Sequence, residues 1–498
     1  MSSEASGCLV QVQAVSNLNM WTDLNPECTF FQQEYCRCTP FAISETDITP
    51  SGGVAQWGRL LVFEVPRAGD LLGATFLKIQ RAGARILTAS GFVPVVGTTV
   101  SFVNMSGYAA CQSVILEIGN IQVDKLSGTF LGILEQHRAH VGNCQGVSIG
   151  DFQEPTATGG LISLSEWSWN NQIMYIALHF FFFEHPEMYL PIIALSAHGV
   201  RVKVQLTNFN QMVNHASGGV ATDVLPIATT LDATFNGQII DASLTVRMVF
   251  LDQFERNLVS AEVHELLTLQ HQEDWFQTSV PVNASTFTTT LSFNNAIMAI
   301  FVVYQLDSAT ASSNFNQKDF FNFSVLRPGM GITTAPFDEQ PNTISGGAAA
   351  TGLQKTPICL WRLQFNGQDR VSARESEYFT QVTPFLHSVK KSYDLSVLSY
   401  YWHLAPLSDY QMYAGSANFS RMHEVKSSGT FCTATVTSAS AVPAPALASY
   451  PQYTSGSSIL VPQGGSGGFD NGSGAVSHMV MSYNVGRISH GQYVMKFA

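Results

Sequence analysis

Several short segments of this chain alternate apolar and polar residues, and this pattern restricts the fold more than any other feature. In Gly199–Leu206, the side chains of Val200, Val202, Val204 and Leu206 point one way, and those of the residues between them point the other way. A side-chain period of two is typical of a strand with one buried face. Ser113–Gly119 and Thr245–Asp252 repeat the pattern. Such strands need a second sheet over the apolar face, so the sequence predicts an all-β protein built from sandwiches.

The length of the chain predicts two such sandwiches. Its 498 residues exceed what one hydrophobic core normally organises, and 45% of them are hydrophobic, which is enough for two interiors. The 39 glycines and 20 prolines are spread along the chain, as expected for many turns and long loops. The low-complexity stretches Gly346–Ala350 and Gly464–Gly474 are predicted loops.

Few helices are expected, and the best candidate begins at Asp252. Its carboxylate could cap the helix, and Glu255, three residues later, would complete a capping box. Val259, Val263 and the pair Leu266-Leu267 then recur at helical spacing, which predicts about three turns packed against a sheet edge.

Two further segments are assigned from their local patterns. Ile173–Phe183 is the most apolar stretch, but it is shorter than the roughly 20 residues of a membrane span, and it is predicted to be a buried strand. The tetrapeptide Phe-Asn-Gly-Gln occurs at Phe235–Gln238 and again at Phe365–Gln368. Asn-Gly is a hairpin signal, so each copy predicts a turn.

The charge of the chain argues against direct contact with nucleic acid. Its net charge is −12 and no basic run or arm occurs; the densest basic site, Lys390-Lys391, is interpreted as a solvated surface pair. Phosphate binding needs clustered Lys and Arg. Only 12% of the residues are charged, which favours a protein that covers much of its surface with copies of itself.

The eight cysteines are too sparse for a disulfide framework, and no signal peptide is recognised, so reduced thiols are expected. Cys36 and Cys38, with Cys28 nearby, leave two interpretations open. They could belong to a zinc site, although a second ligand pair is missing. Alternate residues on a strand share a face, so two small buried side chains is the simpler interpretation.

Catalytic motifs were sought, and none has its required context. Gly464–Gly468 matches G-x-S-x-G, but the run is nearly all glycine and no helix is expected after it. His264-Glu265 begins like a zinc-protease helix, but Thr268 stands where the second histidine is needed, and His271 lies too far along. The sequence therefore predicts no catalytic, cofactor-binding or metal-binding residues, and no enzyme.

Five blocks occur in order along nearly the whole chain and carry a family resemblance. They are Asn25–Phe31 with Thr39–Ala42; Ser113–Gly119 with Val123–Lys125; Leu190–Leu195 with His198 and Val200–Val202; Phe250–Asp252 with Glu255-Arg256 and His264-Glu265; and Phe365–Arg370 with Arg374-Glu375, Tyr378-Phe379, Ser416–Arg421 and Tyr483–Val485. Together they resemble the major capsid proteins of nucleocytoplasmic large DNA viruses. Cys36 and Cys38 depart from that pattern, because the family often has basic residues there.

The resemblance implies two tandem eight-stranded jelly rolls with long loops and few short helices. It implies an N-terminal arm over residues 1–24, a first jelly roll with a linker at its end over 25–240, and a second over 241–498. Three copies would form a pseudo-hexagonal capsomer of an icosahedral shell, as virion components assembled in the host cytoplasm. The implied partners are neighbouring capsomers, minor capsid proteins and an internal viral membrane, with no cofactor and no direct nucleic acid.

Two other functions account for part of the same pattern. A carbohydrate-binding or glycan-cleaving β-sandwich protein would also be rich in strands and poor in charge, but it should show a pair of acidic residues in a cleft or clustered exposed aromatics. A minor or vertex capsid protein would share the family blocks and would differ in copy number.

Overall fold

A computed structural model provides the structure of the chain. It describes residues 38–86, 98–103, 105–138, 170–183, 185–217, 231–276, 286–306, 320–321, 323, 356, 358–387, 396–404, 413–431, 433–435, 458–460 and 474–497. The chain divides into two compact units, Met1–Pro40 and Phe41–Ala498, and the second contains all the strands described below. The expected arm over residues 1–24, the cysteines Cys28 and Cys36, and the glycine run at 464–468 lie outside the described residues.

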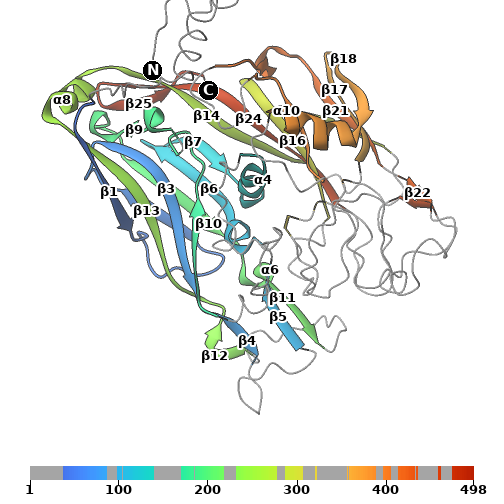
Figure 1. Cartoon of the computed structure of the whole chain (residues 1–498), viewed down its shortest axis with the longest axis horizontal. Coiled ribbons are helices and arrows are strands. Elements are labelled where there is room, and N and C mark those ends of the chain that lie inside the picture. Colours follow the sequence, from blue (N-terminus) through green and yellow to red (C-terminus); the bar gives the residue numbers. More distant parts are fainter. Residues whose placement is uncertain are drawn as a thin grey trace, which may run out of the picture. The chain divides into compact units, whose positions relative to one another are not determined.

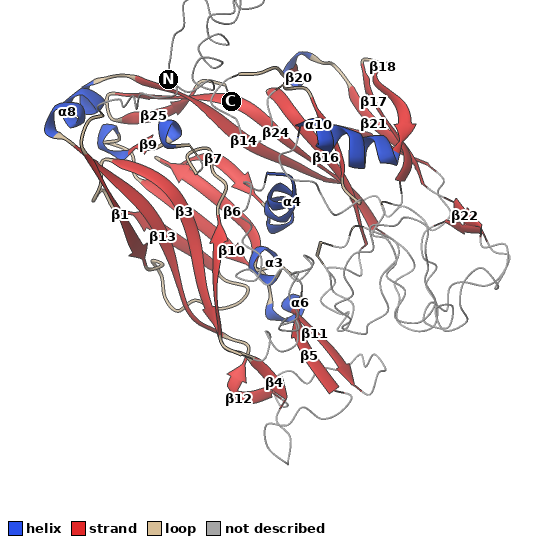
Figure 2. Cartoon of the chain, viewed as in Figure 1, coloured by secondary structure: helices blue, strands red, loops and turns tan. Residues whose placement is uncertain are grey.

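Eight main strands in the first half lie in two antiparallel sheets, four in each (Figures 1 and 2). Along the chain they are β1 (Phe41–Ile48), β2 (Leu60–Val65), β3 (Leu71–Arg81), β6 (Cys111–Ile118), β7 (Ile121–Leu126), β8 (Gln172–Ala177), β10 (Val200–Leu206) and β13 (Ile239–Leu251). The sheet orders are β1-β13-β3-β8 and β2-β10-β6-β7. We call this the first sandwich.

Eight strands in the second half repeat the arrangement. They are β14 (His264–Phe276), β15 (Thr286–Thr290), β16 (Ala296–Leu306), β17 (Ile358–Phe365), β18 (Gln368–Glu375), β19 (Leu398–Tyr401), β21 (Val425–Phe431) and β24 (Gly474–Ser489). Their sheet orders are β14-β24-β16-β19 and β15-β21-β17-β18. If each set of eight is numbered along the chain, both sandwiches have the orders 1-8-3-6 and 2-7-4-5, so the same topology occurs twice.

Shorter strands either extend these sheets or form separate pairs, and short helices connect them. The additional strands are β4 (Ala84–Ile86), β5 (Thr98–Phe102), β9 (Leu190–Pro191), β11 (Val213–Ser217), β12 (Leu231–Asn236), β20 (Ala417–Asn418), β22 (Thr433–Thr435), β23 (Ser458–Leu460) and β25 (Gln492–Met495). Of these, β9, β20 and β25 extend the main sheets, and the others form the separate pairs β4-β12, β5-β11 and β22-β23. The helices are α3 (Ser106–Ala109), α4 (Gly128–Arg138), η2 (Pro186–Met188), η3 (Ile192–Ala194), α6 (Phe209–Met212), α8 (Gln253–Ala261), η4 (Tyr378–Val382), α10 (Thr383–His387) and η5 (Phe419–Arg421). Among the described residues no helix is long and apolar enough to span a membrane.

The predicted alternating strands are confirmed. In β10, Val200, Val202, Val204 and Leu206 are buried and the residues between them are half-buried. In β6, Val114, Leu116 and Ile118 point into the same interior. The predicted all-β double sandwich is therefore the fold of the chain, and its strand order is that of a jelly roll in each half.

The interiors form two apolar clusters. One fills the second sandwich alone and includes Ile300, Val302 and Trp361. The other fills the first sandwich and continues onto β14, β16 and β24 through Leu269, Phe301 and further residues of those strands. One sheet of the second sandwich is thus packed on both of its faces.

The predicted helix is shorter than expected. α8 ends at Ala261, and the residues from His264 onward form β14, which pairs with β24 along its whole length. Val263, Leu266 and Leu267 therefore do not extend a helical stripe, because thirteen cross-strand pairs outweigh the local helical spacing. Asp252 makes no side-chain cap hydrogen bond, and α8 has no buried residue, so the predicted capping box and packed helix are also wrong.

Three smaller expectations need correction. Only the first part of Ile173–Phe183 is a strand, and Ile173 and Tyr175 on it are exposed. The turn Phe365–Gln368 is a hairpin with positive φ at Asn366 and Gly367, whereas the residues around Gly237 join strands that pair elsewhere. Cys359 is disulfide-bonded, so the expectation of reduced thiols is wrong for this residue. A count of cysteines cannot show which strands lie side by side.

The expected domain boundary at residue 240 falls inside β13. Both strands that pair with β13, β1 and β3, belong to the first sandwich. The helix α8 follows directly and leads into the first strand of the second sandwich.

Candidate functional site: the junction between the sandwiches

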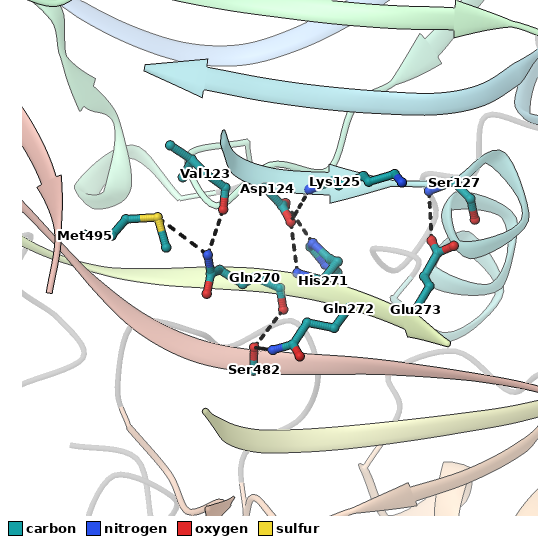
Figure 3. A network of polar contacts seen from close by, with 10 residues as sticks. All are labelled: Val123, Asp124, Lys125, Ser127, Gln270, His271, Gln272, Glu273, Ser482 and Met495. Atoms are coloured by element: carbon teal, nitrogen blue, oxygen red, sulfur yellow. Dashed lines mark hydrogen bonds and ion pairs between the residues drawn. The ribbon is translucent and has the colours of Figure 1, made fainter. Parts of the chain in front are cut away.

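The candidate site is the contact between the two sandwiches, where buried polar side chains of both sandwiches meet. Within the chain, the edge strand β7 of the first sandwich lies against the edge strand β14 of the second (Figure 3). Edge strands carry unpaired backbone groups that need partners. Here side chains supply those partners.

Asp124 on β7 and His271 on β14 form the centre of the junction. One carboxylate oxygen of Asp124 accepts from the backbone N–H of His271 at 2.9 Å, and the other contacts His271 Nδ1 at 2.8 Å. Both side chains are fully buried. The backbone N–H of Lys125 also donates to Asp124, so three N–H groups converge on one buried carboxylate. Hydrogen bonds to a buried charge are strong, and removing one partner leaves the others unsatisfied.

Gln270 makes the neighbouring contacts across the same junction. Its Nε2 donates to the carbonyl of Val123 at 2.8 Å. Its side-chain oxygen accepts from Asn484 at 2.8 Å and from Asn295 at 3.1 Å, so β14 is tied at once to β7 and to its own sheet. Ser482 donates to the Gln270 carbonyl and accepts from Gln272 Nε2 (Figure 3).

Helix α4 begins at the end of this contact. Ser127 caps it by accepting from Phe130 N–H at 3.1 Å, and Ser127 N–H donates to Glu273 on β14 at 2.8 Å. The sequence between β7 and the helix therefore fixes both the helix start and its contact with the second sandwich.

The helix packs its apolar side chains on the outer face of the sheet β14-β24-β16-β19, meaning the face directed away from the interior of its own sandwich. The Phe130 ring lies 5.2 Å from that of His271 and 6.1 Å from that of Phe301. The His137 ring lies 5.1 Å from Phe301, and burial lowers the His137 pKa to about 4. Every residue of α4 whose burial is described is buried.

The equivalent helix of the second sandwich is not covered in this way by any of the described residues. After β18, the π-helix η4 continues into α10, in the same place between the fifth and sixth main strands that α4 occupies in the first sandwich. Its inner side is fixed by Phe379, which packs 4.9 Å from Trp361, and by Thr383, which donates to the Ser399 carbonyl at 2.6 Å. Its outer side exposes Val382, Phe385 and Leu386.

His264 and His271, considered as metal ligands from the sequence, lie at different places on β14. His264 lies at the start of β14 with Nε2 2.7 Å from the Val259 carbonyl, while His271 contacts Asp124 at the junction. Cys38 is exposed. Within the described part of the chain, no group of three or more His, Cys, Asp or Glu side chains could hold a metal ion.

The junction is not among the features predicted from the sequence. His271 was considered only as a metal ligand, and Asp124 only as part of a family block. The one signal that could have indicated it is Asp124, an acidic residue within the strand Ile121–Leu126.

Models of known protein families match both halves of the chain. A family model described as "Major capsid protein N-terminus" matches residues 29–252, and one described as "Large eukaryotic DNA virus major capsid protein" matches residues 255–456. Together they cover the first sandwich from β1 onward and the second sandwich as far as β21, and they meet at α8.

Individual relatives match along most of their length. The chain is 26% identical to the major capsid protein of Phaeocystis pouchetii virus, with 84% of this chain and 91% of the relative covered. It is 24% identical to the major capsid protein of Paramecium bursaria Chlorella virus 1, with 99% and 100% covered.

Solved structures show the same fold. The capsid protein in a quasi-atomic model of the PBCV-1 capsid matches with a TM-score of 0.67 at 21% identity, covering 94% of this chain and 100% of that one. The Faustovirus major capsid protein matches with a TM-score of 0.60 at 10% identity, covering 97% and 96%. The duplicated jelly roll and the two family matches together show that this chain belongs to the major capsid proteins of large eukaryotic DNA viruses.

Proposed function

We propose that three copies of this chain associate into a capsomer of pseudo-hexagonal outline, and that these capsomers tile an icosahedral shell. The observation that carries the proposal is the repeated topology. Two sandwiches of the same strand order already stand in one chain, joined edge to edge at β7 and β14. Three chains supply six such units, which suits a hexagonal net, and a heterologous contact closes into a ring when its rotation allows.

The role is structural and has no catalytic centre. Membership of a capsid protein family supports it. Binding would come from apolar burial, at about 25 cal/mol per Å² of apolar area, repeated at each contact between copies. The partners we propose are further copies, neighbouring capsomers, minor capsid proteins and an internal viral membrane, with assembly in the host cytoplasm. Nucleic acid is not among them, since the net charge is −12.

For the domains, we propose a first jelly roll that ends with β13 and a second that begins after α8. The pairing of β13 with β1 and β3 supports this shift of the boundary from residue 240 to about residue 252. The arm over residues 1–24 stays part of the proposal.

The test is the mass and outline of the purified full-length protein. Light scattering coupled to size exclusion should give three times the 54.2 kDa of the chain, and electron microscopy should show hexagonal particles. A monomer at micromolar concentration, or a particle of another symmetry, would contradict the proposal. Binding of a glycan panel by dispersed monomers would favour the carbohydrate-binding alternative.

A further inference from the structure

We infer that β18 and α10 of one copy dock on the outer face of β1 and β13 in the next copy, and that this contact holds the capsomer together. The inference rests on the proposed trimer and adds to it the two surfaces that meet. Its basis is the contact already present inside the chain, which serves as a template for the contact between chains.

The template consists of three elements: an edge strand, the helix that follows it, and the strand of the next sandwich that both of them contact. Strand β7 is the fifth main strand of its sandwich, α4 follows it, and both contact β14, the first main strand of the next sandwich. In the second sandwich the fifth main strand is β18, and η4 with α10 follows it. Among the described strands, β1 is the other first main strand, and no such neighbour lies beside it. The same topology therefore predicts that β18 and α10 contact strand β1 of another copy of the chain.

The correspondence extends to a local irregularity. The β6–β7 pairing shifts register between Leu116 and Glu117, and the β17–β18 pairing shifts between Leu363 and Gln364, at the same distance from each hairpin turn. The extra residues are Val123 and Arg370. Val123 is the residue whose carbonyl binds Gln270 across the junction, so Arg370 occupies the equivalent place on β18. Bulges commonly redirect an edge strand, so the two edges are alike next to their hairpin turns, although β17–β18 has a further shift between Trp361 and Leu363.

The helix of the second sandwich exposes an apolar stripe that the first sandwich buries. Val382, Phe385 and Leu386 are 43%, 85% and 61% exposed, at spacings of three and four residues. Side chains at those spacings lie on one face of a helix. The inner face is held by Phe379 and Thr383, so the stripe cannot turn inward without breaking those contacts. The corresponding apolar residues of α4 are fully buried.

The receiving surface is the outer face of β1 and its neighbours. Phe41 and Ile43 point outward on β1 and are 61% and 54% exposed, although both are large and apolar. On β14, the equivalent strand, Leu269 is buried under the first sandwich. β1 is also the edge of its sheet, with β13 on one side only among the described strands.

Charge on the two surfaces is compatible with this contact. The exposed carboxylates of Glu45 and Asp47 on β1 pair with Arg247 on β13 and Lys78 on β3, so the receiving face carries charges of both signs. β18 likewise exposes Arg370 and Arg374 beside Asp369 and Glu375, with Arg374 held over the Tyr378 ring at 4.3 Å. Rim charges of opposite sign speed association and select the register more than they add affinity.

Crosslinking tests the contact directly. A benzophenone amino acid at position 385 is placed in the full chain, and that protein is mixed during refolding or co-expression with an equal amount of 15N-labelled chain. We expect photocrosslinks from position 385 to peptides containing 41–48 or 239–251, half of them to the other isotope. Trimers in which position 385 crosslinks to other segments would overturn the inference and leave the trimer intact. A wild-type protein that never forms trimers would overturn the proposed function itself.

Two matched substitutions give an independent measurement. Ile43→Lys places a charge on the receiving face, and Leu60→Lys places one on β2, in the other sheet of the same sandwich, where the side chain is 52% exposed. Both positions are exposed, so both monomers should fold with wild-type circular dichroism. We expect at least a 100-fold rise in the trimer dissociation constant for Ile43→Lys, the same for Phe385→Lys, and less than a threefold change for Leu60→Lys. Equal effects of Ile43→Lys and Leu60→Lys, or none from Phe385→Lys, would overturn the inference.

Discussion

The two sheets that contain the first strand of each sandwich have the same topology but opposite surroundings. The outer face of β14-β24-β16-β19 is apolar and buried under α4, with Phe301, Met479 and Met481 in the core of the first sandwich. The outer face of β1-β13-β3-β8 carries Glu45, Arg247 and Lys78 beside exposed Ile43 and Tyr175. Strand order alone therefore does not determine the character of a sheet face. The neighbour that covers the face does.

This difference also separates two kinds of stability. The covered face contributes to the folding of one chain, because its contacts form within that chain. The open face can contribute only when a second copy is present, and its contribution depends on protein concentration. The predictions below test this division.

The largest effect is expected inside the first sandwich. Val202 is 1% exposed in β10, so Val202→Asp buries an unpaired charge. We expect the loss of soluble trimer and recovery of the protein as aggregate, since such changes cost more than about 4 kcal/mol. Size exclusion of the expressed variant is the measurement. Arg201→Ser, at the half-exposed neighbouring position, is the control, and a normal trimer from Val202→Asp would refute the expectation.

The two equivalent helices should differ most clearly in a pair of alanine substitutions. Phe130→Ala in α4 should lower the free energy of unfolding by about 3–5 kcal/mol, because it leaves a cavity between the sandwiches. Phe385→Ala in α10 should change it by less than about 0.5 kcal/mol. Urea denaturation at several protein concentrations, extrapolated to the monomer, measures both. Similar losses for the two variants would remove the distinction between the helices.

Acid should weaken the covered face. Burial holds the folded-state pKa of His137 at about 4, below its ordinary value of 6.5, so the unfolded chain binds the proton more readily. The stabilisation is present above about pH 6.5 and is lost as pH falls toward 4, by about 3 kcal/mol from this residue. His478, with a pKa lowered to about 3, acts in the same direction. His137→Phe should reduce the slope of unfolding free energy against pH between 6.5 and 4; an unchanged slope would show that His137 does not contribute.

The junction carboxylate should have an intermediate effect. Asp124→Ala leaves three N–H groups without an acceptor, including the backbone N–H of His271. We expect a loss of about 2–3 kcal/mol in unfolding free energy. Asp124→Asn keeps one acceptor oxygen and should lose less. Hydrogen exchange at the amide of His271 should rise in both variants, and an amide as protected as in the wild type would argue against the assigned bond.

The smallest effect is expected on the open face. Asp47 pairs with Lys78 at 3.5 Å, and its side chain is 52% exposed. Exposed pairs of this kind contribute less than about 1 kcal/mol. Asp47→Asn should therefore leave the unfolding free energy of the monomer nearly unchanged at 0.15 M salt, as measured by urea denaturation. A loss as large as that of Asp124→Ala would mean that the face is already covered within one chain.

The sequence predicted the strands well and the junction poorly, for a physical reason. Alternation in Val200–Leu206 reports burial of one face, which is a local property of a strand. Whether the other face is also buried depends on a neighbour far along the chain, as for Phe301, which packs against Phe130 of α4. The helix expected to continue to Leu267 is wrong for the same reason, since the cross-strand partners of β14 lie at least 200 residues away.

The candidate site was out of reach for a related reason. Asp124 and His271 are separated by 147 positions, and neither belongs to a motif with fixed spacing. Exposed apolar residues such as Phe385 and Ile43 look like core residues in a sequence. Only the fold shows that they face outward.

The hydrogen bonds around Asp124 and Gln270 also affect how fast copies associate and how much entropy they lose on association. Because these bonds define a single geometry between the two halves, each chain presents rigid surfaces to its neighbours before any encounter. Association then does not have to order a hinge between the two sandwiches. The conformational entropy that a flexible two-part protein would lose at each contact is instead lost during folding. A shell with many copies gains that advantage at every contact.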